Sequence, residues 1–133
     1  MGARILVVDD DPEILEAIEI ILQASGYQVV TAKDGEEGLA KLKDERPDLM
    51  ILDLLMPKMD GFEVCKQLKD PRMVKYANVP IIVLTAVPEK AGQRRYELET
   101  GLRMDVDDYV EKPIERSTLL ERVEKLLKKA GKV

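Results

Sequence analysis

The sequence predicts an α/β fold in which a five-stranded parallel sheet is covered by helices on both faces. Short β-branched runs recur along the chain, and the segments between them carry apolar residues at helical spacing. Strands that alternate with helices form βαβ units, which place their strands in parallel. A chain of 133 residues with 45% hydrophobic content suffices for one compact domain, which we expect to span residues 1–133.

Five segments are expected to form the strands, because each is short, rich in β-branched residues and bounded by turn residues. In chain order they are residues 4–9, 27–31, 49–53, 80–85 and 107–111. The first and fourth strands contain the sequences ILVV and IIVL, which are apolar at every position. A strand without polar positions needs cover on both faces, so these two strands are expected near the centre of the sheet.

The first helix is expected directly after the first strand. Asp11 is a suitable N-cap, Pro12 a suitable first-turn residue and Gly26 a suitable C-terminal stop. Between these signals the apolar residues have helical spacing: Ile14, Leu15, Ile18, Ile21 and Leu22. The sequence therefore predicts an amphipathic helix that packs one face on the sheet.

The later helices rest on looser signals. Two patterns, Asp34–Glu37 and Asp60–Glu63, resemble capping boxes and predict where the second and third helices begin. A fourth helix is expected over about 89–101, and an extended loop over 70–80. The last helix is expected from one apolar face: Leu119, Leu120, Val123, Leu126 and Leu127.

Composition excludes several classes of function. The chain has no histidine, so it has no His-based general acid or base, catalytic triad, imidazole zinc site or phosphohistidine. A net charge of −5 without a basic arm argues against nucleic-acid binding. No run is long enough to span a membrane and no signal peptide is recognisable, so we expect a cytoplasmic protein. The single cysteine, Cys65, is expected to be a small buried residue on a helix.

The strand ends are the place to look for function, because open parallel sheets gather their functional groups at the carboxyl edge. Carboxylates, a hydroxyl and an ammonium group stand at or just after four of the predicted strand ends: Asp9, Asp10, Asp11, Asp53, Thr85 and Lys112. Asp11 is assigned to the helix cap, which leaves the other acids for function. We expect these groups to share a small space.

A cluster of acids needs a compensating cation. Two like charges about 4 Å apart repel by about 4 kcal/mol at the effective dielectric constant of a protein surface. Lys112 supplies one positive charge, but a divalent metal ion would compensate the negative charge of the acids more fully. Carboxylates and water favour magnesium over zinc or copper, and magnesium keeps waters that a phosphate can displace. The cluster therefore predicts a phosphoryl-transfer site.

Four motifs resemble those of response-regulator receiver domains from two-component signalling. They are VVDDDP, LMILDLLMPKMDGFEV, PIIVLTA and DDYVEKPI, and they occur in the family's order over nearly the whole chain. The size is similar to that of the single-domain chemotaxis regulator. The resemblance implies a flavodoxin-like (βα)5 fold with strand order 2-1-3-4-5, present either as a stand-alone regulator or as part of a longer protein.

The resemblance also implies roles for individual residues. Asp53 matches the phosphorylated aspartate. Mg²⁺, or Mn²⁺ in its place, would be held directly by Asp10 and Asp53, through water by Asp9, and by the backbone carbonyl of Leu55. The residues that would bind the phosphoryl group or respond to it are Thr85, Ala86, Tyr109 and Lys112. The peptide bond before Pro113 is expected to be cis, as in the family.

The implied function is a phosphorylation-dependent switch. The donor would be a phosphohistidine on a sensor histidine kinase or phosphotransfer protein, which supplies the residue type that this chain lacks. The domain would assist its own phosphorylation and dephosphorylation without being an enzyme for another substrate. Its output surface would comprise the fourth helix, fifth strand and fifth helix. The downstream effector stays open, as does the choice between a monomer and a phosphorylation-dependent dimer.

Two alternatives come from other classes of protein. A phosphatase of the haloacid dehalogenase type also uses a nucleophilic aspartate with magnesium, but that family expects a second aspartate where Leu55 stands. A flavodoxin-like interaction module would bind a nucleotide or flavin without being phosphorylated. The first strand-to-helix turn, DDDP, lacks the glycine-rich or hydroxyl-rich cradle that such a ligand needs.

Overall fold

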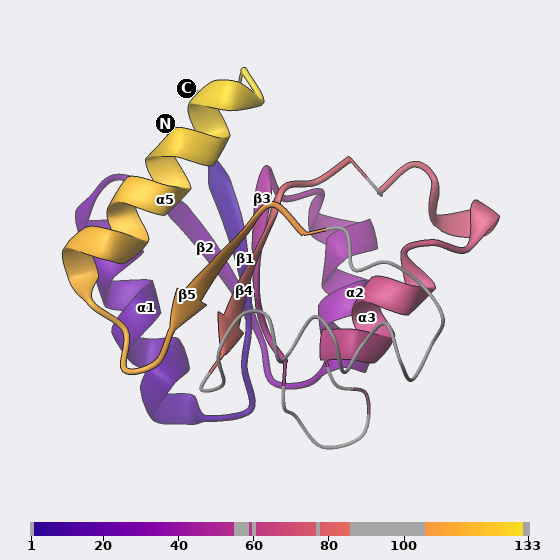
Figure 1. The fold of residues 1–133 in the computed structure, drawn as a ribbon, viewed down its shortest axis with the longest axis horizontal. Helices are drawn as coiled ribbons and strands as arrows, with labels where there is room; N and C mark the ends of the chain where they lie inside the picture. Colours follow the sequence, from indigo (N-terminus) through magenta and orange to yellow (C-terminus); the bar gives the residue numbers. More distant parts are fainter. Residues whose placement is uncertain (1, 55–58, 60, 77, 86–105, 132–133) are drawn as a thin grey trace.

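Five strands of the computed structural model form a parallel sheet in the order β2-β1-β3-β4-β5 (Figure 1). The structure describes residues 2–54, 59, 61–76, 78–85 and 106–131. The strands are β1 Arg4–Val8, β2 Gln28–Ala32, β3 Leu49–Asp53, β4 Ile81–Thr85 and β5 Asp108–Glu111. The predicted fold class and strand order are confirmed, and β1 and β4 are interior strands as expected.

The helices lie on both faces of this sheet (Figure 1). They are α1 Pro12–Ala24, α2 Gly35–Glu45, α3 Gly61–Gln67 and α5 Arg116–Lys129. Asp11 caps α1 by accepting a 2.9 Å hydrogen bond from the Glu13 N–H, and Asp34 caps α2 in the same way from Glu37. The helix predicted over 89–101 lies outside the described residues.

Several predicted boundaries need correction. β2 covers Gln28–Ala32 rather than 27–31, and β4 and β5 each begin one residue later than predicted. β1 ends at Val8 rather than at Asp9, because the Asp9 carboxylate turns to accept a 3.0 Å hydrogen bond from the Asp11 N–H. The segment 70–80, predicted as a loop throughout, contains a short 3₁₀ helix, η1 Pro71–Met73. Asp70 nucleates it by accepting a 2.9 Å hydrogen bond from the Arg72 N–H, with proline in the first position.

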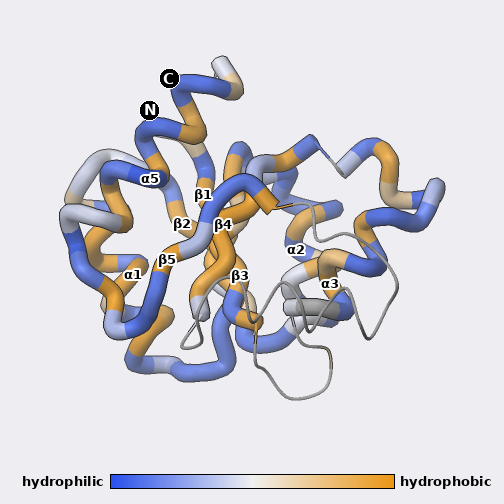
Figure 2. Tube along the Cα trace, in the orientation of Figure 1, coloured by the Kyte–Doolittle hydropathy of each residue, from blue (hydrophilic) through white to orange (hydrophobic). Residues whose placement is uncertain are grey.

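The core consists of two apolar layers separated by the sheet. Alternation along β1 sends Leu6 and Val8 to one face and Ile5 and Val7 to the other. The first layer is completed by buried residues of α2 and α3, including Cys65, and the second by those of α1 and α5. Figure 2 shows the interior strands as the hydrophobic centre of the molecule. Fully covered strands hold their carboxyl ends in fixed positions, which is what the site requires.

None of the helices that the structure describes combines the length and the apolar character needed to cross a bilayer.

Candidate functional site

The polar groups predicted from the strand ends lie at one edge of the sheet. Asp53 and Thr85 are the last residues of β3 and β4, while Asp9 and Lys112 directly follow β1 and β5. Parallel registration aligns these ends, since Thr85 pairs with Glu111, the residue before Lys112. The Lys112 N–H also donates a 2.9 Å hydrogen bond to the Thr85 carbonyl. Residues that are distant in sequence are therefore brought together by strand order alone.

Burial distinguishes this edge from the rest of the described chain. Among the described residues, the buried polar or charged ones are Asp9, Asp53 and Thr85, with exposed fractions of 0%, 4% and 3%. Asp10 is exposed. Taking carboxylates out of water costs several kcal/mol unless they are paired. Groups buried at such a cost point to function rather than to stability.

Lys112 bridges the two buried acids. Its Nζ lies 3.1 Å from Asp9 Oδ2 and 3.2 Å from Asp53 Oδ1. Asp9 Oδ1 accepts the Asp11 N–H, but Asp9 Oδ2 receives no well-directed hydrogen bond from the described residues. Its contact with the ammonium group is therefore a charge attraction that leaves bonding capacity for another ligand. The peptide bond between Lys112 and Pro113 is cis.

The acid cluster fits a hard divalent cation. Oxygens of Asp9, Asp10 and Asp53 all lie within 4.8 Å of one another. Among the described residues, Lys112 is the one cation paired with these three carboxylates, and its single charge leaves part of their negative charge uncompensated. An all-oxygen donor set with an incompletely bonded buried oxygen suits Mg²⁺ or Mn²⁺. The cluster could bind a metal ion of this kind.

The electrostatics of the cluster shift two pKa values. Burial raises the pKa of Asp53 to about 6; the charge of Asp9 adds to this, and Lys112 offsets part of it. Burial alone would lower the pKa of Lys112, but the carboxylates of Asp53 and Asp9 outweigh it and raise the value. Without a metal, a proton therefore competes for Asp53 in weak acid.

Comparison with known proteins decides the family. The response regulator receiver domain family matches residues 5–124 of the sequence. This chain belongs to that family. The receiver domain is 41% identical over 130 residues to the alkaline phosphatase synthesis transcriptional regulatory protein PhoP of Bacillus subtilis, covering 98% of this chain and 50% of that protein. The receiver domain spans about half the length of the curated relatives it matches.

Solved structures agree with this assignment. Chemotaxis protein CheY4 of Vibrio cholerae is 32% identical with a TM-score of 0.80, over 94% of this chain and 98% of that one. The signal receiver domain of a histidine kinase from Syntrophus aciditrophicus is 33% identical with a TM-score of 0.83, over 99% and 95% of the two chains. The receiver domain therefore resembles single domains of its own size, and it also matches about half of the longer regulator PhoP.

Two of the residues predicted for the site, Leu55 and Ala86, lie outside the described residues.

One contact beside the site was not predicted. Tyr109 is half-buried in β5, and its carbonyl accepts a 3.0 Å hydrogen bond from Arg122 of α5. The same nitrogen of Arg122 donates to Asp108 at 2.5 Å. Sequence reasoning missed Arg122, because a helical arginine carries no local signal for a bond to a strand.

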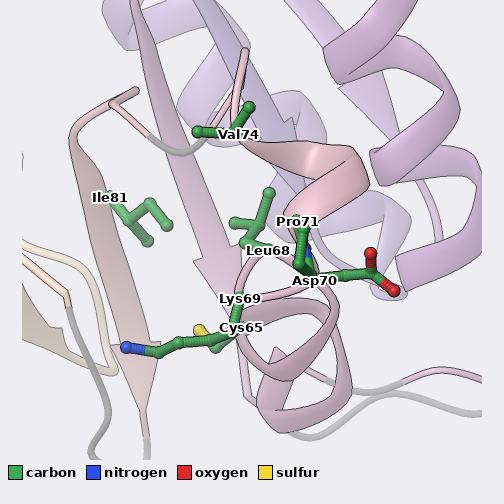
Figure 3. Close-up of a pocket in the computed structure, with 7 residues that line it drawn as sticks. All are labelled: Cys65, Leu68, Lys69, Asp70, Pro71, Val74 and Ile81. Atoms are coloured by element: carbon green, nitrogen blue, oxygen red, sulfur yellow. The ribbon is translucent and has the colours of Figure 1, made fainter.

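Thr85, Tyr109 and Arg122 line one cavity of about 410 Å³, beside the acidic edge. A second cavity, of about 280 Å³, lies between α3, η1 and the beginning of β4 (Figure 3). Its lining residues are Cys65, Leu68, Lys69, Asp70, Pro71, Val74 and Ile81. Ile81 begins β4 whereas Thr85 ends it, so the second cavity lies toward the opposite end of the strand and contains no predicted site residue.

Replacing Asp11 with alanine is expected to separate its role from that of its two neighbours. The substitution removes the cap of α1 and should lower the free energy of unfolding by about 1 kcal/mol. Affinity for Mg²⁺ should stay near the wild-type value, because Asp11 is not one of the three clustered acids. Urea unfolding and calorimetric titration measure the two effects. Asp11→Asn retains a capping oxygen and should keep most of the stability, so a large loss of Mg²⁺ affinity in both variants would contradict this division of roles.

Proposed function

We propose that this receiver domain accepts a phosphoryl group on Asp53 from a phosphohistidine of a sensor histidine kinase or phosphotransfer protein. The observation that carries the proposal is the buried Asp53 carboxylate, flanked by Asp9 and by the Lys112 ammonium group at 3.2 Å. Phosphoryl acceptance is the general function of the family to which the chain belongs. Because these 133 residues contain no histidine, the donor imidazole must come from outside them.

The chemistry is a displacement at phosphorus. A carboxylate oxygen of Asp53 attacks, the bond between phosphorus and the donor imidazole nitrogen breaks, and an acyl phosphate forms on Asp53. Lys112 lies where it can exchange its contact with Asp53 for one with a phosphoryl oxygen. Thr85, at the adjacent strand end, offers a hydroxyl to another oxygen. Positioning and charge neutralisation, rather than acid–base catalysis, carry this reaction.

Asp9, Asp10 and Asp53 would hold Mg²⁺, or Mn²⁺, together with the carbonyl of Leu55. The bound ion would neutralise negative charge on the phosphoryl oxygens. Asp9 contributes in two ways, because one oxygen is fixed by the Asp11 N–H while the other stays available beside Lys112. This arrangement fits a ligand that acts through water, as the family resemblance implies.

The phosphorylated state would be transmitted from the site to the output surface. Thr85 and Ala86 would respond to the phosphoryl group, and Tyr109 would change its side-chain conformation with them. Such a response selects between two pre-existing arrangements of the fourth helix, fifth strand and fifth helix. The effector is open, and the proposal includes no nucleic-acid contact by this chain, whose net charge is −5. Either a monomer or a phosphorylation-dependent dimer would fit.

Mass spectrometry after treatment with acetyl phosphate, or with beryllofluoride, in the presence of Mg²⁺ tests the proposal. We expect a covalent phosphoryl adduct, and a tight beryllofluoride complex, in the wild type and in Asp44→Asn, whose acid is exposed on α2. Both should be lost in Asp53→Asn. An adduct that persists in Asp53→Asn, or that never forms in the wild type, would contradict the assignment. Turnover of a generic phosphate monoester would instead favour the phosphatase alternative.

A further inference from the structure

The segment that follows Asp53 is tied at both ends to glycine residues. Gly61, the first residue of α3, donates its N–H to the carbonyl of Leu54 at 2.9 Å. Gly35, the first residue of α2, donates its N–H to the carbonyl of Met59, also at 2.9 Å. Leu54 directly follows Asp53, so two helices hold the chain on either side of the segment that leaves the acid cluster.

Both positions require glycine because of space. At Gly61 a Cβ atom would overlap the carbonyl oxygen of Asp53 itself and lie 2.8 Å from the Cα of Leu54. At Gly35 it would overlap the carbonyl oxygen of Met59. Neither glycine has a positive φ, so backbone conformation does not explain the choice. At Gly61 the atoms that exclude a side chain are all backbone atoms, which cannot move aside by changing rotamer. At Gly35 the nearest atom is a backbone oxygen, and side-chain atoms of Val64 and Met59 lie at 2.8 and 2.9 Å.

The bond from Gly35 uses a group that a helix leaves free. The first N–H groups of a helix have no partner within it. In α2 the side chain of Asp34 caps the Glu37 N–H, and the Gly35 N–H is directed to Met59. Because α2 is anchored in the core by the buried residues Leu39 and Leu42, it forms a fixed support for that carbonyl.

We propose that Gly35 and Gly61 are positioning residues for phosphoryl acceptance, a role that rests on the function proposed above. Because these positions carry no side chain, α2 and α3 can come close enough to donate hydrogen bonds to the backbone carbonyls of Met59 and Leu54, on either side of the segment that follows Asp53. These two hydrogen bonds set the direction in which the Asp53 carboxylate faces Asp9 and Lys112. They also fix both ends of the segment that carries Leu55, whose carbonyl is the proposed fourth metal ligand.

Gly38 provides a matched control on the same helix. A Cβ atom there would lie 2.9 Å from a methyl group of Val8, and its nearest neighbours all belong to that side chain. The site is less crowded than Gly35, and its close contacts are with a core side chain rather than with the backbone after Asp53. Alanine at position 38 therefore measures the effect of replacing a crowded glycine of α2 while leaving the hydrogen bonds to Leu54 and Met59 in place.

Calorimetric Mg²⁺ titration and single-turnover phosphorylation by acetyl phosphate compare Gly35→Ala, Gly61→Ala and Gly38→Ala. We expect all three variants to lose stability. Gly35→Ala and Gly61→Ala should weaken Mg²⁺ binding about tenfold, as when an outer contact of a ligand is lost. They should also phosphorylate slowly at saturating Mg²⁺, whereas Gly38→Ala should match the wild type in both. Equal Mg²⁺ affinity and rate in Gly35→Ala and Gly38→Ala would overturn the proposal.

Amide hydrogen exchange in the metal-free wild type tests these two hydrogen bonds without a variant that could misfold. The N–H groups of Gly35 and Gly61 should be protected, and protection should rise with Mg²⁺ and beryllofluoride. Exchange of the Gly35 amide at the rate of a free amide would overturn the proposal. A wild type without an acyl phosphate contradicts the proposed function. A wild type that forms one, while Gly35→Ala behaves as Gly38→Ala, contradicts only the positioning role.

Discussion

Replacing Lys112 with methionine is expected to slow phosphorylation of Asp53 about 100-fold, the usual cost of removing a donor aimed at developing charge. The Lys112 ammonium group lies 3.1 Å from Asp9 and 3.2 Å from Asp53, within reach of a phosphoryl oxygen bound between them. Methionine preserves much of the aliphatic stem and removes the charge. The rate of acyl phosphate formation from acetyl phosphate, followed by mass spectrometry, measures the loss.

The same substitution should tighten Mg²⁺ binding. The ammonium group and the metal neutralise the same carboxylates, so removing Lys112 leaves the three acids without a positively charged partner among the residues that the structure describes. Calorimetric titration at pH 8 is suitable, because Lys112 lowers the pKa of Asp53 and its loss would raise that pKa above the present value of about 6. Slower chemistry with tighter metal binding is a pattern that simple destabilisation does not produce.

Two further variants complete this test. Lys128→Met removes an exposed ammonium group that pairs with Glu124 at 2.9 Å, and it should change neither the rate nor the affinity. Lys112→Arg keeps the charge and should recover part of the rate. If Lys112→Met bound Mg²⁺ more weakly than the wild type, or were phosphorylated at the wild-type rate, the proposed role of Lys112 would be wrong.

The acid cluster could be predicted from sequence because two simple rules meet there. Hydrophobic periodicity locates the strands, and parallel connection brings their carboxyl ends to one edge. Asp9, Asp53 and Lys112 each stand at such an end, so their meeting follows from topology without any knowledge of side-chain conformation. Asp11 could likewise be assigned to the cap, because the signal of a cap lies within a few neighbouring residues.

What could not be predicted depends on contacts between elements. The bond from Arg122 to the Tyr109 carbonyl joins a helix to a strand, and that from Gly35 to Met59 joins a helix to a loop. Neither leaves a pattern in the neighbouring sequence, since backbone carbonyls accept from any donor that packing brings near. The unequal roles of the two Asp9 oxygens also emerge only when the turn into α1 and Lys112 are both in place.

Replacing Asp53 with asparagine is expected to stabilise the metal-free protein at neutral pH. The folded protein holds the pKa of Asp53 at about 6 against an ordinary value of 3.8, so folding favours the protonated acid. The stability contributed by that proton is complete below pH 3.8 and is lost as pH rises through about 6. Asparagine does not ionise and suffers no such loss. After discounting for solvent screening, the advantage of the variant at pH 7.5 is about 1–3 kcal/mol.

Urea unfolding in EDTA from pH 4.5 to pH 8 measures this difference. The advantage of Asp53→Asn over the wild type should be small at pH 4.5, grow through pH 6 and level off above it, while Asp44→Asn, an exposed acid on α2, shows no such profile. Saturating Mg²⁺ should narrow or reverse the advantage, because the ion stabilises the folded wild type that binds it. An advantage independent of pH, or a variant less stable than the wild type at pH 7.5 in EDTA, would show that ionised Asp53 carries no such cost. The acid that the reaction requires would then be tolerated by the fold without help from a metal.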